Sequence, residues 1–139
     1  MAPASAPPFQ PPAIPWLAPC ALPADPDLGP GLDPRALKAA LQRLCGLEEV
    51  RAVVAFGSRV RGEARPDSDL DLAVILRQPQ LSPEQKLPAW RRCRQALGRL
   101  GVGSDLVVVG WRDAERLSQS RWHVLGDVAR QGRVLHVAG

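Results

Sequence analysis

Two aspartates, Asp69 and Asp71, stand one residue apart at the start of an apolar run that continues to Leu76. Alternate side chains of a strand point to opposite faces, so this spacing predicts both carboxylates on one side, with Leu70 and Leu72 directed into a core. Like charges held so close together repel each other unless a cation lies between them. Carboxylate oxygens are ligands that Mg²⁺ takes, commonly together with substrate phosphates. The pair therefore predicts a Mg²⁺ site at the edge of a sheet.

A glycine and a serine, Gly57 and Ser58, follow another apolar run and precede the first aspartate with ten residues between. Glycine lets the backbone approach a phosphate, and Ser58 can open a short helix whose N–H groups face that anion. Together with the acids, this turn predicts a site for a nucleoside triphosphate and its metals. Arg61 and Arg65 lie between the two parts, where guanidinium groups would meet phosphate oxygens; a solvated surface charge is the alternative for each.

The arrangement Gly57-Ser58, ten residues, then Asp69-x-Asp71 resembles the signature of the DNA polymerase beta-like nucleotidyltransferase superfamily. The run from Phe56 to Val74 is most similar to the minimal nucleotidyltransferase (MNT) branch of that superfamily. The resemblance implies that Asp69 and Asp71 bind two Mg²⁺ ions and that ATP is the substrate. Asp105, which opens the next apolar run, fits the position of a third carboxylate that completes one metal site. Capping of a strand after a glycine-rich turn is the alternative for Asp105.

The resemblance also implies a function. Proteins of the MNT branch act largely as antitoxins paired with HEPN-domain toxins, and they adenylylate a tyrosine of the toxin. We therefore expect transfer of AMP from ATP to a hydroxyl of a HEPN-domain partner, with Asp69, Asp71 and Asp105 as the catalytic residues. A chain this short leaves no second domain to hold an acceptor, which favours a partner protein. The alternatives are a free-standing transferase for a small molecule such as an aminoglycoside, and a non-catalytic antitoxin that only binds its toxin.

The pattern of apolar residues predicts the elements that position these acids. Asp33 and Pro34 are typical of a helix start, and Gly46 of its end. The Ser82-Pro83-Glu84-Gln85 run resembles a capping box, although Pro88 moves the expected regular part of that helix to near Leu87. The fold class is α/β (α+β), a small mixed sheet of about four strands with flanking helices, the polymerase beta-like palm. The expected strands are 51–56, 69–76, 105–109 and 133–137, and the expected helices are 34–45, 58–64, 87–100 and 118–130.

Prolines divide the chain into two parts. Eleven of the 15 prolines fall within residues 1–34. Because proline removes backbone donors and fixes φ, residues 1–31 are expected to form a disordered, Pro-rich tail. A misplaced gene start is the alternative explanation for that tail. The nucleotidyltransferase domain is then expected to span residues 32–139.

Composition limits the setting and the partners. Residues 35–139 carry 18 basic and 11 acidic side chains, so this part has a net charge of +7. Such a surface suits a triphosphate, an acidic protein or a nucleic acid, and direct nucleic-acid binding is not favoured. Three widely spaced cysteines and the lack of a membrane-spanning or secretory segment indicate the cytoplasm. We expect Trp90 and Trp122 to lie in the core and His123 to be structural.

Overall fold

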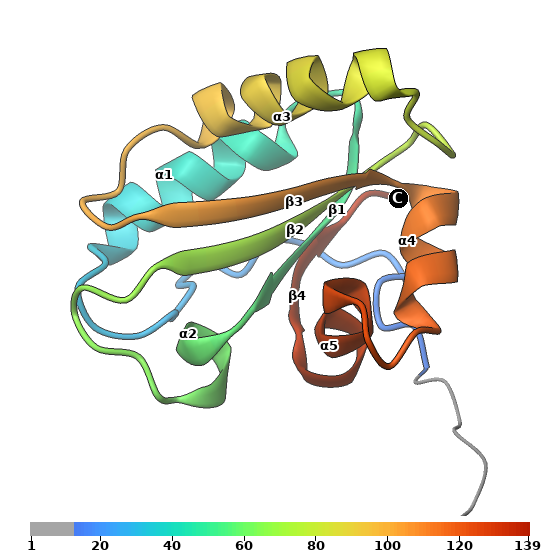
Figure 1. Cartoon of the computed structure of the whole chain (residues 1–139). Helices are drawn as coiled ribbons and strands as arrows, with labels where there is room; N and C mark the ends of the chain where they lie inside the picture. The colour runs from blue at the N-terminus through green and yellow to red at the C-terminus, as the bar shows by residue number, and fades with distance from the viewer. Residues whose placement is uncertain (1–12) are drawn as a thin grey trace, which may run out of the picture.

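The computed structural model describes residues 13–139, in which five helices and four strands form (Figure 1). In chain order these elements are α1 (Pro34–Cys45), β1 (Val50–Phe56), α2 (Ser58–Arg61), β2 (Leu70–Leu76), α3 (Pro83–Leu97), β3 (Ser104–Gly110), α4 (Trp111–Ser118), α5 (Val124–Gln131) and β4 (Arg133–Val137). All four predicted strands are present, with ends that differ from the prediction by one residue at most.

The four strands form one mixed sheet in the order β3-β2-β1-β4. β1 runs antiparallel to both of its neighbours, whereas β2 and β3 are parallel and are joined through α3. A parallel pair needs such a crossover, because a short turn cannot return the chain to the same edge of the sheet. The predicted α/β class, with a four-stranded mixed sheet and flanking helices, is confirmed.

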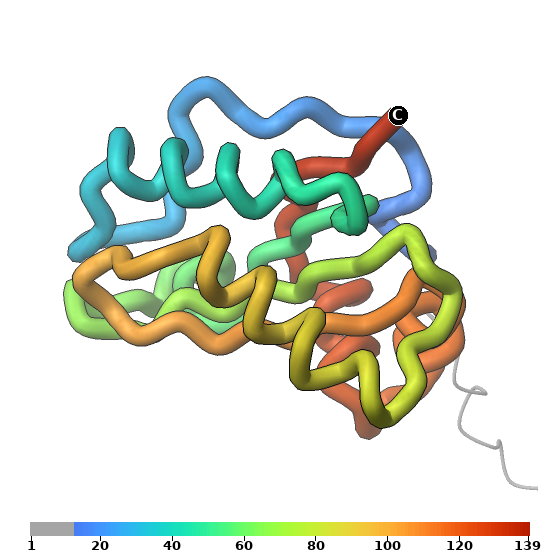
Figure 2. Tube along the Cα trace, turned by 90° about the horizontal axis from the view of Figure 1, so that it is seen from above, coloured from blue at the N-terminus to red at the C-terminus, as the bar shows by residue number. Residues whose placement is uncertain are grey.

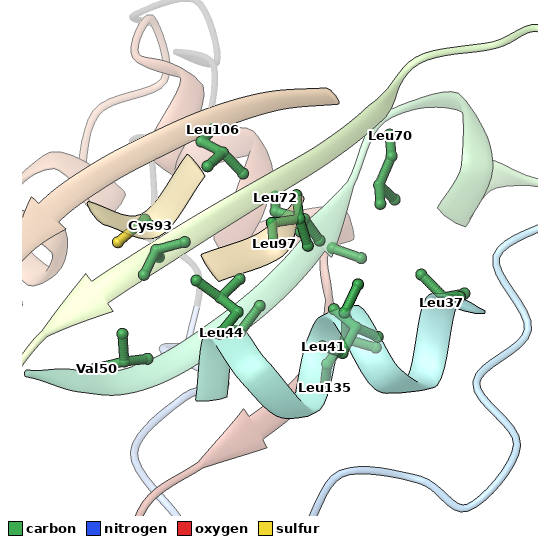
Figure 3. Close-up of a cluster of buried hydrophobic side chains, with 14 of the residues drawn as sticks. Leu37, Leu41, Leu44, Val50, Leu70, Leu72, Cys93, Leu97, Leu106 and Leu135 are labelled. Carbon is green, nitrogen blue, oxygen red and sulfur yellow. The ribbon is translucent and has the colours of Figure 1, made fainter. Parts of the chain in front are cut away.

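Helices cover both faces of the sheet, and the alternation of side chains along β1 and β2 supplies a core to each face (Figure 1). α1 and α3 cover one face, where leucines fill most of the space (Figure 3). The buried residues of this first cluster include Leu37, Leu41, Leu44, Val53, Leu72, Val74, Cys93 and Leu97. α4 and α5 cover the other face, whose buried residues include Trp16, Ala52, Val54, Ala73, Ile75, Leu125 and Val128.

The helix ends follow the predicted signals in part. The Asp33 side chain accepts a hydrogen bond from the Ala36 N–H at 3.1 Å and caps α1. Gln85 accepts one from the Ser82 N–H at 2.9 Å, which caps α3. α3 begins at Pro83, so the expected start near Leu87 is wrong. Pro88 lies inside α3, where it removes one backbone donor, yet the helix continues through it to Leu97. None of the helices in residues 13–139 is long and apolar enough to span a membrane.

The segment before α1 packs against the domain. Residues 1–12 lie outside the described residues, but residues 13–31 contact both faces of the sheet, so the expected disordered tail is wrong for this part. Trp16 is 2% exposed and Leu28 is 1% exposed. Cys20 and Val137 exchange two backbone hydrogen bonds, of 3.0 and 2.8 Å. Figure 2 shows the segment passing beside the C-terminal residues and then along α1. The prolines prevent a regular helix or strand in this segment, but they do not prevent burial of the large apolar side chains of Trp16 and Leu28.

The chain after β3 forms two helices, α4 and α5, and the expected single helix over residues 118–130 is wrong. The His123 ring nitrogen Nδ1 accepts a hydrogen bond from the Leu125 N–H at 3.1 Å and caps the second helix. This contact gives His123 the structural role that we expected. Trp122 is 88% exposed and Trp90 is 37% exposed, so neither lies in the core.

Candidate functional site

The predicted carboxylates meet at one edge of the sheet. Because β2 and β3 are parallel and begin at the same edge, Asp71 pairs with Asp105 across the two strands. Asp69 lies two residues before Asp71, immediately ahead of β2. Asp71 is half-buried, whereas Asp69 and Asp105 are exposed. The topology therefore brings together three acids that are separated by up to 36 positions in the sequence.

Asp71 is the most perturbed of the three acids. The pKa of its carboxyl group is raised from the ordinary 3.8 to about 6, and burial is the largest cause. The charge of Asp105, a hydrogen bond with the Asp105 carboxyl group and the charge of Asp69 contribute to this rise, while the charge of Arg61 opposes it. Such a group is destabilised in its charged form, and perturbed carboxyl groups of this kind concentrate at functional sites.

Two glycines make room for the acids. Gly57 has a φ of +80°, which L side chains rarely adopt, and a side chain there would collide with the Asp71 carboxylate. A side chain at Gly103 would collide with the Asp69 carboxylate in the same way. We predicted that Gly57 lets the backbone approach a phosphate. The structure gives Gly57 a second role, because the lack of a side chain there leaves room for the Asp71 carboxylate beside the end of β1.

Arg59 holds the loop between α2 and β2. This guanidinium group is only 3% exposed. It donates hydrogen bonds to the carbonyl oxygens of Leu28 at 2.9 Å, Pro30 at 2.7 Å and Ser68 at 2.8 Å. Arg59 therefore connects the loop that precedes Asp69 to the segment before α1. Its hydrogen bonds go to the protein itself, which makes Arg59 a structural residue and not a phosphate ligand.

A pocket of about 580 Å³ opens beside Asp71. One wall, which we call the α2 wall, consists of Gly57, Ser58, Arg61 and Asp71. Arg61 also pairs with Glu63 at 3.1 Å, and its side chain is 43% exposed. Arg65 is exposed in the loop before β2 and is not part of the pocket lining. Four predicted residues thus line the pocket, Asp69 and Asp105 lie beside Asp71 without being part of the lining, and Arg65 lies outside.

The opposite wall of the pocket was not predicted. Val124, Asp127 and Gln131 line it from α5, and Phe56 joins them from the end of β1. We call these four residues the α5 wall. The three residues of α5 stand at positions i, i+3 and i+7, so one face of the helix carries all of them. That spacing was visible in the sequence, but polar residues on one helix face are also typical of ordinary solvent-exposed surface. The spacing alone therefore did not indicate a binding site.

The three acids offer the chemistry that Mg²⁺ requires. Carboxylate oxygens are hard ligands, and the raised pKa of Asp71 shows that this edge favours a positive charge beside it. Among residues 13–139, no three His, Cys, Asp or Glu side chains are arranged to hold one metal ion in common. The carboxylates of Asp69, Asp71 and Asp105 thus have the chemistry of Mg²⁺ ligands, but they are not arranged around one common point. The metal site stays a prediction.

Two of the solved structures found by comparison are weak likenesses. A protein described as "toxin-antitoxin with AMP-PNP" aligns over 71% of this chain and 72% of its own, with 21% identity and a TM-score of 0.47. A protein from Sulfolobus solfataricus, proposed to be a nucleotidyltransferase, aligns over 76% of this chain and 90% of its own, with 15% identity and a TM-score of 0.44. Both TM-scores lie below 0.5, so neither structure contributes to the assignment.

Comparison by sequence is more informative. No curated protein matches the chain. The family model of the nucleotidyltransferase domain matches residues 37–120, which is more than half of the 139 residues. The matched range contains the α2 wall and all three acids. The chain therefore belongs to the nucleotidyltransferase domain family.

Proposed function

We propose that this protein transfers AMP from ATP to a hydroxyl group of a partner protein. The observation that carries the proposal is the placement of Asp71 between Asp105 and the Gly57–Ser58 turn, at the mouth of a pocket, in a chain of the nucleotidyltransferase domain family. Three acids that repel each other are stabilised by a cation beside them. Mg²⁺ bound together with a nucleoside triphosphate would supply that cation, and the phosphate oxygens would complete its ligands.

The reaction is a substitution at the α-phosphorus. The acceptor oxygen forms a bond to that phosphorus, the bond from the phosphorus to the oxygen that bridges to the β-phosphate breaks, and pyrophosphate leaves. The hydroxyl proton passes to the Asp105 carboxylate, which is exposed at the pocket edge. Ser58 and the backbone at Gly57 hold phosphate oxygens, and Arg61 pairs with them by charge. Catalysis of this kind depends on positioning and neutralisation of charge, which a small domain can provide.

Mg²⁺ would be held by Asp69, Asp71 and Asp105. When bound, it neutralises triphosphate charge and stabilises the attacking and departing oxygens. Asp71 is the shared ligand in this proposal, since it lies between the other two acids and is the least exposed of the three.

The acceptor is proposed to come from a second protein. In residues 13–139 the two apolar clusters account for the helices and the sheet, and no further domain covers the pocket. The MNT branch that the chain resembles pairs with HEPN-domain toxins, so we propose a tyrosine hydroxyl of such a toxin as the acceptor. An exposed pocket edge suits an acceptor that is delivered by docking.

The test uses labelled ATP, Mg²⁺ and a HEPN-domain protein encoded beside this chain. We expect mass spectrometry to find an added adenylyl group on a toxin tyrosine. The adduct should be absent with Asp71→Ala and retained with Asp67→Ala, a matched change at an exposed loop position. Neutralisation of the toxin by the Asp71→Ala protein, without any adduct from the wild type, would contradict the proposal and favour a binding-only antitoxin. Transfer to an added aminoglycoside but not to the toxin would favour a small-molecule transferase.

A further inference from the structure

The pocket has two chemically different walls. The α2 wall carries a hydroxyl group, a guanidinium group and a carboxylate, from Ser58, Arg61 and Asp71. The α5 wall carries two half-buried apolar side chains, Phe56 and Val124, together with a carboxylate and an amide, from Asp127 and Gln131. A volume of about 580 Å³ is within the usual range for sites that bind whole small molecules. The pocket is therefore larger and more varied than a site for phosphate alone would require.

The acid on the α5 wall cannot face a triphosphate. The Asp127 carboxylate accepts a hydrogen bond from Arg130 at 2.5 Å, within an i, i+3 ion pair on α5. This pair offsets the negative charge of Asp127 and holds one carboxylate oxygen in place. A carboxylate accepts hydrogen bonds and cannot donate them, so its natural partner in a nucleotide is a ribose hydroxyl or an exocyclic amine.

The remaining polar group on the α5 wall is the Gln131 amide. An amide offers both a donor and an acceptor, and so do the edges of nucleobases. Gln131 lies at the end of α5, two residues before the point where β4 begins to pair with β1. Phe56 is at the end of β1 and supplies apolar surface on the same wall. An aromatic or aliphatic surface beside an amide matches the flat face and polar edge of a base.

We propose that the α5 wall binds the nucleoside half of the donor, with Asp127 and Gln131 as the residues that distinguish a nucleotide from bare polyphosphate. This inference rests on the proposed function, since it assigns the second half of the same pocket. It gives a role to the two exposed polar side chains that α5 presents to the pocket, while Leu125 and Val128 of the same helix fill the core. The α2 wall would bind any triphosphate, and the α5 wall would supply the preference for a nucleoside.

The test measures binding of ATP and of inorganic tripolyphosphate by calorimetry, with Mg²⁺ present. The wild type should bind ATP at least about tenfold more tightly than tripolyphosphate, the equivalent of one or two hydrogen bonds and the buried base. Asp127→Ala and Gln131→Ala should each weaken ATP binding by about tenfold and leave tripolyphosphate binding unchanged. Thermal melting of each variant checks that α5 still folds.

Matched controls exist on other helices. Asp113→Ala breaks the corresponding i, i+3 ion pair with Arg116 on α4, and Gln95→Ala removes an exposed amide from α3. Both controls should bind ATP as the wild type does. Equal affinity of the wild type for ATP and tripolyphosphate, or equal weakening of both ligands in the α5 variants, would overturn this inference while the proposed function stands. Failure of the wild type to bind either ligand would overturn both.

Discussion

The two walls of the pocket are built in different ways. The α2 wall comes from one short stretch of sequence, in which a glycine turn and an acidic strand start are ten residues apart. Its one acid, Asp71, has a pKa that is raised by burial and by the neighbouring carboxylates of Asp105 and Asp69. Three of the four residues of the α5 wall lie more than 50 positions further along, and the acid among them, Asp127, pairs with Arg130 within its own helix. The comparison indicates that the spacing of nearby residues in the sequence determines the phosphate and metal chemistry of the pocket. The shape of the pocket depends on where the fold places a distant helix, α5.

The largest expected effect is on the α2 wall. Asp71→Ala removes the carboxylate that lies between Asp69 and Asp105, so nucleotidyl transfer should fall by at least about a thousandfold. Binding of the partner should survive, because docking uses other surface. Single-turnover transfer from labelled ATP measures the rate, with Asp67→Ala as the exposed control. A fall of less than about tenfold for Asp71→Ala would show that the three acids are not the catalytic group.

The α5 wall should depend on the segment before α1. Trp16 is buried in the same cluster as Leu125 and Val128 of α5, so Trp16→Ala leaves a cavity under that helix. We expect a loss of about 3 kcal/mol in the free energy of unfolding, measured by urea denaturation. Leu17→Ala is the control, since Leu17 is 52% exposed. Equal stabilities of the two variants would mean that residues 13–31 are not packed on the domain in solution.

The α2 wall should depend on Arg59 in a comparable way. Arg59→Ala leaves buried carbonyl oxygens of the preceding segment and of the loop before β2 without donors, so we expect a loss of about 2 kcal/mol. Arg65→Ala, at an exposed position in the same loop, should change stability by less than about 0.5 kcal/mol. Urea denaturation of both variants gives the comparison. If Arg65→Ala lowered the free energy of unfolding as much as Arg59→Ala does, the structural role assigned to Arg59 would be contradicted.

The smallest expected effect is a gain in stability. The pKa of Asp71 is about 6 in the folded protein and 3.8 ordinarily, so the folded state holds its proton more tightly, and stability falls as pH rises from about 4 through 6. Asp71→Asn removes this penalty. After allowance for solvent screening, the variant should be more stable than the wild type by about 1 kcal/mol at pH 7.5 without divalent metal.

The gain from Asp71→Asn should vanish below about pH 4, where the wild-type carboxyl group is protonated in both states. Urea denaturation at pH 3.5 and pH 7.5, with a chelator present, measures the difference. Asp67→Asn, at an exposed position in the loop before β2, is the control. A variant that is less stable than the wild type at pH 7.5 would contradict the repulsion assigned to Asp71.

The sequence predicted the strands and the acidic edge because both depend on local rules. Alternation of apolar residues places Leu72 and Ala73 on opposite faces, and the start of two parallel strands brings Asp71 and Asp105 together. The segment before α1 was predicted wrongly, since a count of prolines says nothing of what Trp16 can contact. Burial of that side chain depends on a cluster formed by residues far along the chain, from Ala52 to Val137.

The break between α4 and α5 was missed for a similar reason. An apolar pattern over residues 118–130 fits one helix, but the His123 side chain caps a new helix, and Trp122 is turned into solvent. The α5 wall was missed with it, because Asp127 and Gln131 have meaning only when α5 lies across the pocket from Ser58. Arg65 shows the reverse case, since a position in the motif loop does not bring its side chain to the pocket.

Thermal melting with ATP and Mg²⁺ tests the central claim, a metal-assisted nucleotide site built on Asp69 and Asp71, most directly. A ligand that binds only the folded state raises its stability by mass action. ATP and Mg²⁺ together should raise the melting temperature of the wild type by more than the sum of their separate effects. The Asp69→Asn/Asp71→Asn protein should show no such joint increase. The same joint increase in both proteins, or none in the wild type, would contradict the account.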